Sequence, residues 1–120
     1  MRFLLLLLTL FLASCVTPQP PEGSFEDAEE AIEAAVRAGA EDYSPVELKF
    51  AREKLAEAHK GMEAKQYDKA IYLIEQSEIN SELAIEKSRT AEARTRVTEL
   101  SRENEILRED FERTYGEAFR

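Results

Sequence analysis

Acidic residues outnumber basic ones in this chain of 120 residues, with 25 Asp and Glu against 16 Lys and Arg and a formal net charge of -9 at pH 7. Such a surface is repelled by nucleic acid and by anionic lipid head groups, which argues against a nucleic-acid-binding protein. The single cysteine excludes an internal disulfide. The single histidine, His59, excludes a catalytic triad or a paired-histidine metal site within one chain.

Sequence motifs of the common enzyme classes are missing. The chain has no glycine-rich phosphate loop and no nucleophile elbow. One acidic cluster lies in the N-terminal half of a predicted helix, where carboxylates usually complement the helix dipole rather than hold calcium. Its members are Glu26, Asp27, Glu29, Glu30 and Glu33. We therefore expect a protein that is not an enzyme and that uses no cofactor, no metal and no small-molecule substrate.

Residues 1–14 have the pattern of a secretory signal peptide. Met1 and Arg2 form a charged start, an apolar run follows from Phe3 to Ala13, and small residues precede Cys15. As a helix the apolar run would span about 16 Å at about 1.5 Å per residue, whereas the hydrocarbon core of a bilayer is about 30 Å thick. The run is therefore predicted to be a signal peptide and not a stable membrane span.

The end of this segment resembles the lipobox of bacterial lipoproteins, with Leu12, Ala13 and Ser14 directly before Cys15. The resemblance implies cleavage before Cys15 and acylation of its thiol, with palmitate or a similar chain. Two or more acyl chains make a membrane attachment stable. In such lipoproteins an aspartate after the cysteine signals inner-membrane retention, and Val16 stands there. We therefore expect an outer-membrane anchor facing the periplasm, or a cell-membrane anchor if the organism has no outer membrane.

Residues 15–24 are predicted to form an extended tether, because Pro18, Pro20 and Pro21 cannot sustain a helix. Ser24, followed by Asp27, is typical of a helix N-cap, and apolar residues at spacings of three and four predict a first helix over 25–38. Gly39 fits the position just past the end of this helix.

Two further helices are predicted from start signals and apolar spacing. Ser44, Pro45 and Glu47 are typical of a capped start with a capping box, and the spacing that follows predicts a helix over 45–63. A third helix begins near Tyr67 and meets no proline or glycine until Gly116. It carries a heptad of mostly small residues that should lie against the first two helices: Tyr67, Ala70, Ile74, Ser77, Ser81, Ala84, Ser88 and Ala91.

Two segments, 38–58 and 65–84, resemble the bacterial lipoproteins grouped as domain of unknown function 4398. The shared positions include Gly39, Tyr43, Ser44 and Pro45. The resemblance covers about residues 28–95 and implies a secreted or lipid-anchored helical protein, with no catalytic residues to carry over. Residues 67–71 also resemble the start of the second helix of a tetratricopeptide repeat. Since that fold needs about three repeats, we expect a related hairpin and not a peptide-binding solenoid.

The apolar frame changes beyond residue 92. Val97, Leu100, Asn104, Leu107 and Phe111 occupy a and d positions of a heptad on a different face. Three interpretations remain open for residues 96–120: self-association as a coiled coil, docking on another protein, and a free charged helix held by pairs such as Glu92–Arg96 and Glu109–Arg113.

The expected fold is all-α, with short antiparallel helical hairpins and a long C-terminal helix. A three-helix domain would cover residues 25–95, and an extended charged helix residues 96–120. The expected function is that of a lipid-anchored structural or scaffolding protein of the cell envelope. The alternative is an accessory subunit that binds one specific envelope complex through its hairpin or tail.

Overall fold

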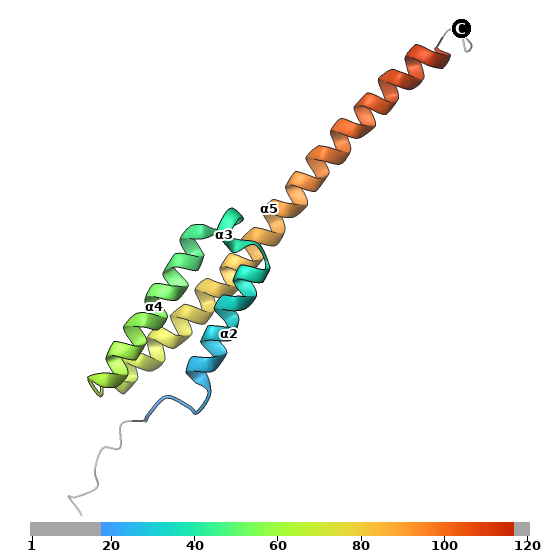
Figure 1. Cartoon of the computed structure of the whole chain (residues 1–120). Coiled ribbons are helices and arrows are strands. Elements are labelled where there is room, and N and C mark those ends of the chain that lie inside the picture. Colours follow the sequence, from blue (N-terminus) through green and yellow to red (C-terminus); the bar gives the residue numbers. More distant parts are fainter. Residues whose placement is uncertain (1–17, 117–120) are drawn as a thin grey trace, which may run out of the picture.

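The computed structural model describes residues 18–116, and the regular elements in this range are all helices. In chain order they are α2 (Ser24–Arg37), α3 (Ala40–Tyr43), α4 (Pro45–Glu63) and α5 (Tyr67–Tyr115). α2 and α4 pack on the first part of α5, and the rest of α5 projects beyond them (Figure 1). The predicted all-α fold with a long C-terminal helix is confirmed. No helix between residues 18 and 116 combines the length and apolarity needed to cross a bilayer.

α4 has the predicted bounds, but its start is built differently from the prediction. Pro45 occupies the first helical position, where its missing N–H costs nothing. Ser44 makes no side-chain cap, so the predicted capping box is wrong. Its hydroxyl donates instead to the Glu47 carboxylate, over 2.6 Å, and is therefore engaged with a side chain.

The start of α2 corrects another prediction. Ser24 is not the N-cap, because Gly23 holds that position with a φ of 87° and Ser24 is already helical. The Gly23 carbonyl accepts from the N–H of Asp27 over 2.8 Å, while the buried Oγ of Ser24 has no hydrogen-bond partner. A glycine can make this left-handed entry without strain, so the helix begins one residue earlier than predicted.

Gly39 ends α2 as predicted, and it also starts an element that the sequence analysis missed. Its φ is 80°, and its N–H donates to the carbonyl of Val36 over 2.9 Å. The single turn α3 follows, with Ala40 fully buried and the N–H of Tyr43 donating back to the Gly39 carbonyl. Four residues are too few to show an apolar period, which explains why this turn was not predicted.

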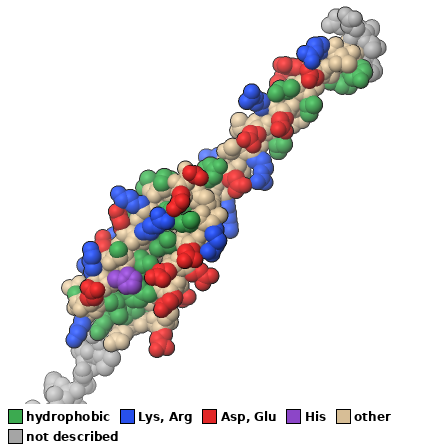
Figure 2. All heavy atoms as spheres, in the orientation of Figure 1, with side chains coloured by type: hydrophobic (Ala, Val, Ile, Leu, Met, Phe, Trp, Pro, Cys, Tyr) green, Lys and Arg blue, Asp and Glu red, His purple; other side chains and the backbone are tan. Residues whose placement is uncertain are grey.

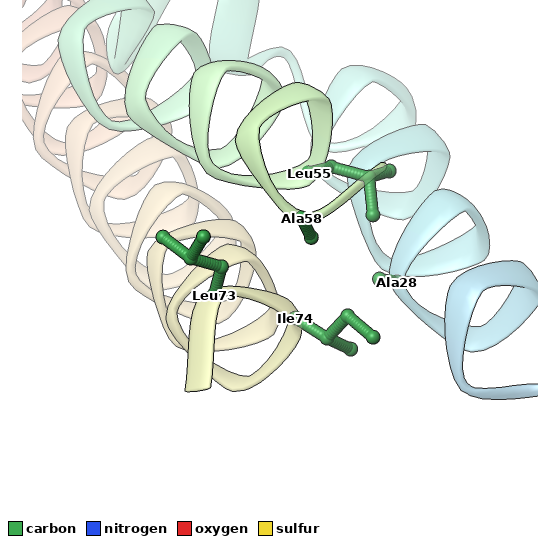
Figure 3. Packing of buried hydrophobic residues seen from close by; sticks show 5 residues of the cluster. All are labelled: Ala28, Leu55, Ala58, Leu73 and Ile74. Atoms are coloured by element: carbon green, nitrogen blue, oxygen red, sulfur yellow. The ribbon is translucent and has the colours of Figure 1, made fainter. Parts of the chain in front are cut away.

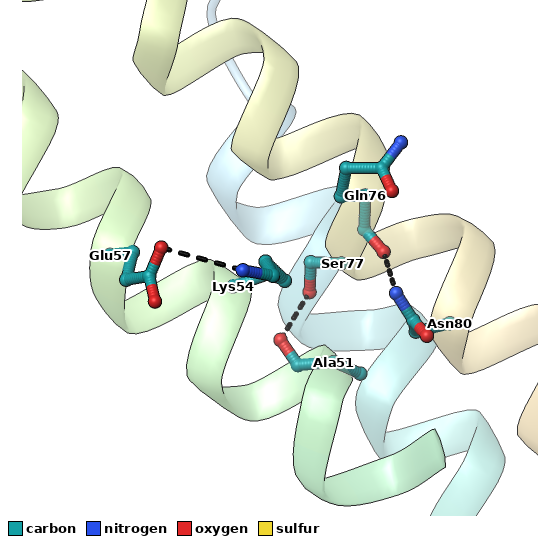
Figure 4. A network of polar contacts seen from close by, with 6 residues as sticks. All are labelled: Ala51, Lys54, Glu57, Gln76, Ser77 and Asn80. Carbon is teal, nitrogen blue, oxygen red and sulfur yellow. Dashed lines mark hydrogen bonds and ion pairs between the residues drawn. The ribbon is translucent and has the colours of Figure 1, made fainter.

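The buried face of α5 is the predicted stripe of small residues. Ala70, Ser77, Ser81, Ala84 and Ser88 are each fully buried, so the backbones of neighbouring helices can approach closely. The Ser77 hydroxyl donates across to the carbonyl of Ala51 in α4 over 2.9 Å (Figure 4). The hydroxyls of Ser81 and Ser88 donate to carbonyls four residues earlier in α5. These buried polar groups are therefore paired, as burial requires.

Two clusters of buried apolar side chains make up the core between the helices. Ala28, Leu55, Ala58, Leu73 and Ile74 form one cluster where α2, α4 and α5 meet (Figure 3). A second cluster contains Ala35, Ala40, Leu48 and Ala84. Ile32 packs on both clusters, which makes them one continuous core at the bundle end of α5.

Candidate functional site

The residues predicted to form the anchor lie outside the described part of the chain. They are Leu12, Ala13, Ser14 and Cys15. The described chain begins with Pro18, and Pro20 and Pro21 border a small cavity beside Ser24 and Ile74. The last part of the predicted tether therefore lies against the bundle, near the start of α5.

The tail residues singled out from the sequence lie on the projecting part of α5. Every residue from 92 to 115 is exposed, including Val97, Leu100, Leu107 and Phe111. Asn104 is exposed as well, and its amide nitrogen donates to the Leu100 carbonyl over 2.9 Å. Figure 2 shows hydrophobic side chains beside charged ones along this segment. The projecting helix thus offers apolar groups that nothing within residues 18–116 covers.

Ion pairs along the projecting helix agree only in part with those predicted. Glu92 and Arg96 pair over 2.9 Å, as expected. Arg113 pairs with Asp110 over 2.6 Å, and not with Glu109. Such exposed pairs support a single helix by a few tenths of a kcal/mol each.

Three exposed apolar residues in the bundle part of α5 were missed by the sequence analysis. Tyr72, Ile79 and Leu83 are 58, 54 and 45% exposed. They continue the a and d register of the tail back through the bundle, because 79 is 28 residues before 107 and 83 is 14 residues before 97. We call this complete row the outer seam. Its positions are Tyr72, Gln76, Ile79, Leu83, Glu86, Thr90, Ala93, Val97, Leu100, Asn104, Leu107 and Phe111.

The outer seam and the buried face occupy opposite sides of α5. At 3.6 residues per turn, the seam lies roughly 160° around the helix from the buried row that includes Ala70, Ser81 and Ser88. Within the seam only Gln76 is half-buried, and the other positions are exposed. A second helix could therefore lie along the seam without displacing α2 or α4.

A polar network fixes the start of α4 to α5. The carboxylate of Glu47 accepts hydrogen bonds from Ser44 and from the Lys87 ammonium. Both bonds favour the charged form, and they lower the pKa of Glu47 from 4.5 to about 2. The Glu47 side chain is 15% exposed, whereas that of Lys87 is 52% exposed. This ion pair lies at the edge of the core and helps to set the register between the two helices.

Acid is expected to weaken the bundle through Glu47. Between pH 5 and pH 2 the unfolded chain takes up a proton at this carboxylate before the folded chain does, so the free energy of unfolding falls as the pH falls. Glu47→Gln should flatten this part of the pH dependence in urea unfolding followed by circular dichroism. Glu53→Gln, at an exposed position of the same helix, controls for the loss of one carboxylate. An unchanged slope in Glu47→Gln would contradict the role assigned to the pair.

Carboxylates also gather where α2 faces α5. The pKa of Glu78 is raised, first because its carboxylate is partly buried and then because Asp27, Glu82 and Glu75 lie near it. Of the acidic cluster noted in the sequence, Asp27 is the member that acts on this group. Within residues 18–116, no group of three or more potential ligands is placed to hold a metal ion.

His59 is exposed on α4, and it stacks on Phe25 of α2. The ring centroids are 4.4 Å apart and the ring planes differ by 27°. This contact holds α2 to α4 near the first core cluster, against which the partly buried Phe25 packs. The histidine therefore has a structural contact that accounts for its position.

Comparison with known proteins identifies one family. The model of the family described as "Domain of unknown function (DUF4398)" matches residues 24–100, which include all of α2, α3 and α4 and most of α5. No curated protein and no solved structure matches the chain. The matched segment covers the whole bundle and the first part of the projecting helix. Since the match extends over more than half of the sequence, this chain belongs to the DUF4398 family.

Proposed function

We propose that this chain is a non-enzymatic lipoprotein, anchored by Cys15 in the outer membrane and facing the periplasm, that acts as a structural or scaffolding element of the cell envelope. The observation that carries the proposal is the shape of α5. The helix is held by the bundle near its start and then continues to Tyr115 with every residue from 92 onward exposed. At about 1.5 Å per residue, this exposed part reaches about 35 Å beyond the bundle.

The arrangement of the two ends of α5 supports a spacer role. The tether enters the bundle at Ser24, beside Ile74 in the first part of α5, so an anchor at Cys15 would place the bundle next to the membrane. The projecting part of α5 would then extend away from the bilayer. Such a helix can connect the membrane surface with another layer of the cell envelope or with a partner protein.

The alternative function is that of an accessory subunit for one envelope complex. It is favoured by the apolar residues exposed on the projecting helix, which a larger partner could cover. The hairpin of α4 and the first part of α5 offers a second surface. We propose that this hairpin is related to a single tetratricopeptide pair, and that it lacks the stacked repeats which form a peptide-binding groove.

The anchor is tested by labelling cells with palmitate. The full chain should incorporate the label and be recovered with the outer-membrane fraction, and Cys15→Ser should abolish labelling. Ser14→Ala keeps a small residue before the cysteine and should preserve it. Labelling that persists in Cys15→Ser, or that is missing from the unaltered chain, would overturn the lipoprotein proposal.

The scaffold and the accessory subunit are separated by photo-crosslinking in living cells, with the reactive residue placed at Tyr72 or at Leu107. Adducts with one other envelope protein would identify an accessory subunit and its complex. Adducts formed only between copies of this chain would favour the structural spacer. Both sites are exposed, so the photoreactive group should not disturb the core.

A further inference from the structure

The outer seam of α5 follows one heptad register, and nothing within residues 18–116 covers it. Its a positions are 76, 83, 90, 97, 104 and 111, and its d positions are 72, 79, 86, 93, 100 and 107. Each of its apolar stretches is shorter than the three or four apolar heptads that indicate a coiled coil by themselves, but both share one register. Apolar side chains concentrate at its two ends, Tyr72 to Leu83 and Val97 to Phe111, with Glu86, Thr90 and Ala93 between them.

We propose that the outer seam pairs with the outer seam of a second copy of this chain, forming a parallel, in-register two-helix coiled coil that runs from the bundle into the projecting helix. This pairing goes beyond the proposed envelope role, because its basis lies in α5 alone and does not depend on the anchor. In the dimer the two bundles lie on the outside, since the seam faces away from α2 and α4.

Charges beside the seam favour the parallel direction. In a parallel pair each g residue lies near the e residue five positions later in the partner helix. Glu82 then faces Lys87 of the second copy, whose ammonium also pairs with Glu47 of its own chain, and Glu103 faces Arg108 of the second copy. Two contacts are unfavourable in this arrangement: Arg89 faces Arg94, and Glu86, at a d position, faces Glu86 of the second copy. Arg108 also contacts Glu105 in its own chain, and its five N–H donors allow it to hold both carboxylates.

The antiparallel arrangement of the same seam brings like charges together. With Tyr72 opposite Phe111, each g residue faces a g residue and each e residue faces an e residue. The pairs that result are Glu75 with Asp110, Glu82 with Glu103, Arg89 with Arg96, and Lys87 with Arg94. Like charges at these positions are unfavourable, so the pattern selects against this alternative.

Asn104 gives a second reason for parallel, in-register pairing. It occupies an a position, which faces the same residue of the partner in a parallel dimer. Two asparagine amides can then hydrogen-bond each other, whereas the antiparallel arrangement places Asn104 opposite the apolar Ile79. A polar a residue of this kind fixes register and helix number at some cost in stability.

Cysteine crosslinking of the full chain in its native membranes tests the arrangement. Ile79→Cys and Leu107→Cys, both at d positions, should each form covalent dimers with a short bis-maleimide. Ile106→Cys is the matched control, because Ile106 is 49% exposed and next to Leu107 but lies off the seam. The unaltered chain, with Cys15 as its one cysteine, sets the background.

Each outcome decides the proposal. Dimers at positions 79 and 107, at yields several-fold above those at position 106, support it. Dimers at position 107 alone would show that the helices do not pair along the bundle part of α5. Equal yields at positions 106 and 107 would show that the contact is not specific to the outer seam. Either result would overturn the proposal. A chain carrying Ile79→Cys that crosslinks to one carrying Asn104→Cys, but not to itself, would show the antiparallel form and overturn the proposal.

A charge reversal provides an independent test that does not disturb folding, since Glu103 is exposed. Glu103→Arg places two like charges at each Glu103–Arg108 pair of the parallel dimer, so crosslinking of Leu107→Cys should fall several-fold. Adding Arg108→Glu should restore it. An unchanged or higher yield would overturn the proposal, and so would a yield near background in the chain with Leu107→Cys alone, because in the antiparallel form position 107 lies opposite Gln76.

Discussion

Leu48→Ala is expected to lower the free energy of unfolding by about 2–4 kcal/mol, the usual cost of removing a buried leucine. Leu48 is 2% exposed and is the largest of the fully buried side chains. Its buried neighbours in the second core cluster are all alanines: Ala35, Ala40 and Ala84. Alanine side chains cannot move to refill a cavity, so only the partly buried Ile32, Val36 and Ile85 at the margin of the cluster can shift towards it. Urea unfolding followed by circular dichroism measures the change.

Val46→Ala is the matched control for this prediction. Val46 lies two residues before Leu48 in the same helix and is 56% exposed, so its truncation should change stability by less than about 0.5 kcal/mol. Domains of this size are stable by about 5–15 kcal/mol, and the loss at Leu48 is therefore a large fraction of the total. A loss below about 1 kcal/mol would show that the cluster does not hold α3 and α4 to α5.

Helix bounds were predictable where the start or stop signal is local. Pro45 begins α4 as predicted, because its fixed φ and missing N–H suit the first helical position. Gly39 adopts the left-handed conformation predicted for it after α2. Signals that depend on a side-chain hydrogen bond were less reliable. Serine is a common N-cap residue, but neither Ser24 nor Ser44 caps a helix with its side chain. Gly23 occupies the N-cap position of α2, and the Ser44 hydroxyl donates to the Glu47 carboxylate.

The two faces of α5 show a different limit. Both follow a seven-residue period, and both are visible in the printed sequence. The small residues at Ala70, Ser77 and Ser81 were correctly assigned to the core because they match the close approach of helices. The sequence does not reveal which of the remaining apolar residues another helix covers. Tyr72 and Ile79 could be recognised as part of the outer seam only from their exposure.

The interruption of the seam also hid its length. Glu86, Thr90 and Ala93 separate the two apolar stretches, so the apolar pattern alone predicts a tail heptad that begins only at Val97. In the structure α5 continues without a break through this segment, and the register is the same on both sides. Because a seven-residue repeat drifts by about 20° per heptad on a straight helix, the row winds slowly around α5, and a left-handed supercoil would keep both stretches against one partner helix.

Leu107→Asp is expected to abolish pairing of the projecting helices while leaving the bundle folded. Leu107 is 65% exposed in the single chain, so the substitution removes no core contact. In a parallel dimer it would remove two leucines from one d layer, each worth about 1.5–3 kcal/mol on burial, and place two carboxylates there. A loss of about 3–6 kcal/mol corresponds to a dissociation constant about 10²–10⁴-fold higher. Sedimentation of the full chain in detergent measures the change from dimer to monomer.

Ile106→Asp separates this effect from a general loss of surface hydrophobicity. It introduces the same charge on the adjacent residue, which is also exposed but lies at a c position outside the seam. The dimer should persist in this variant, because the c position faces solvent in a two-helix coiled coil. Equal loss of mass in both variants would indicate association through a nonspecific apolar surface, and a dimer that survives Leu107→Asp would place the contact elsewhere. Only the combination of a monomeric Leu107→Asp and a dimeric Ile106→Asp fits a partner helix lying along the outer seam.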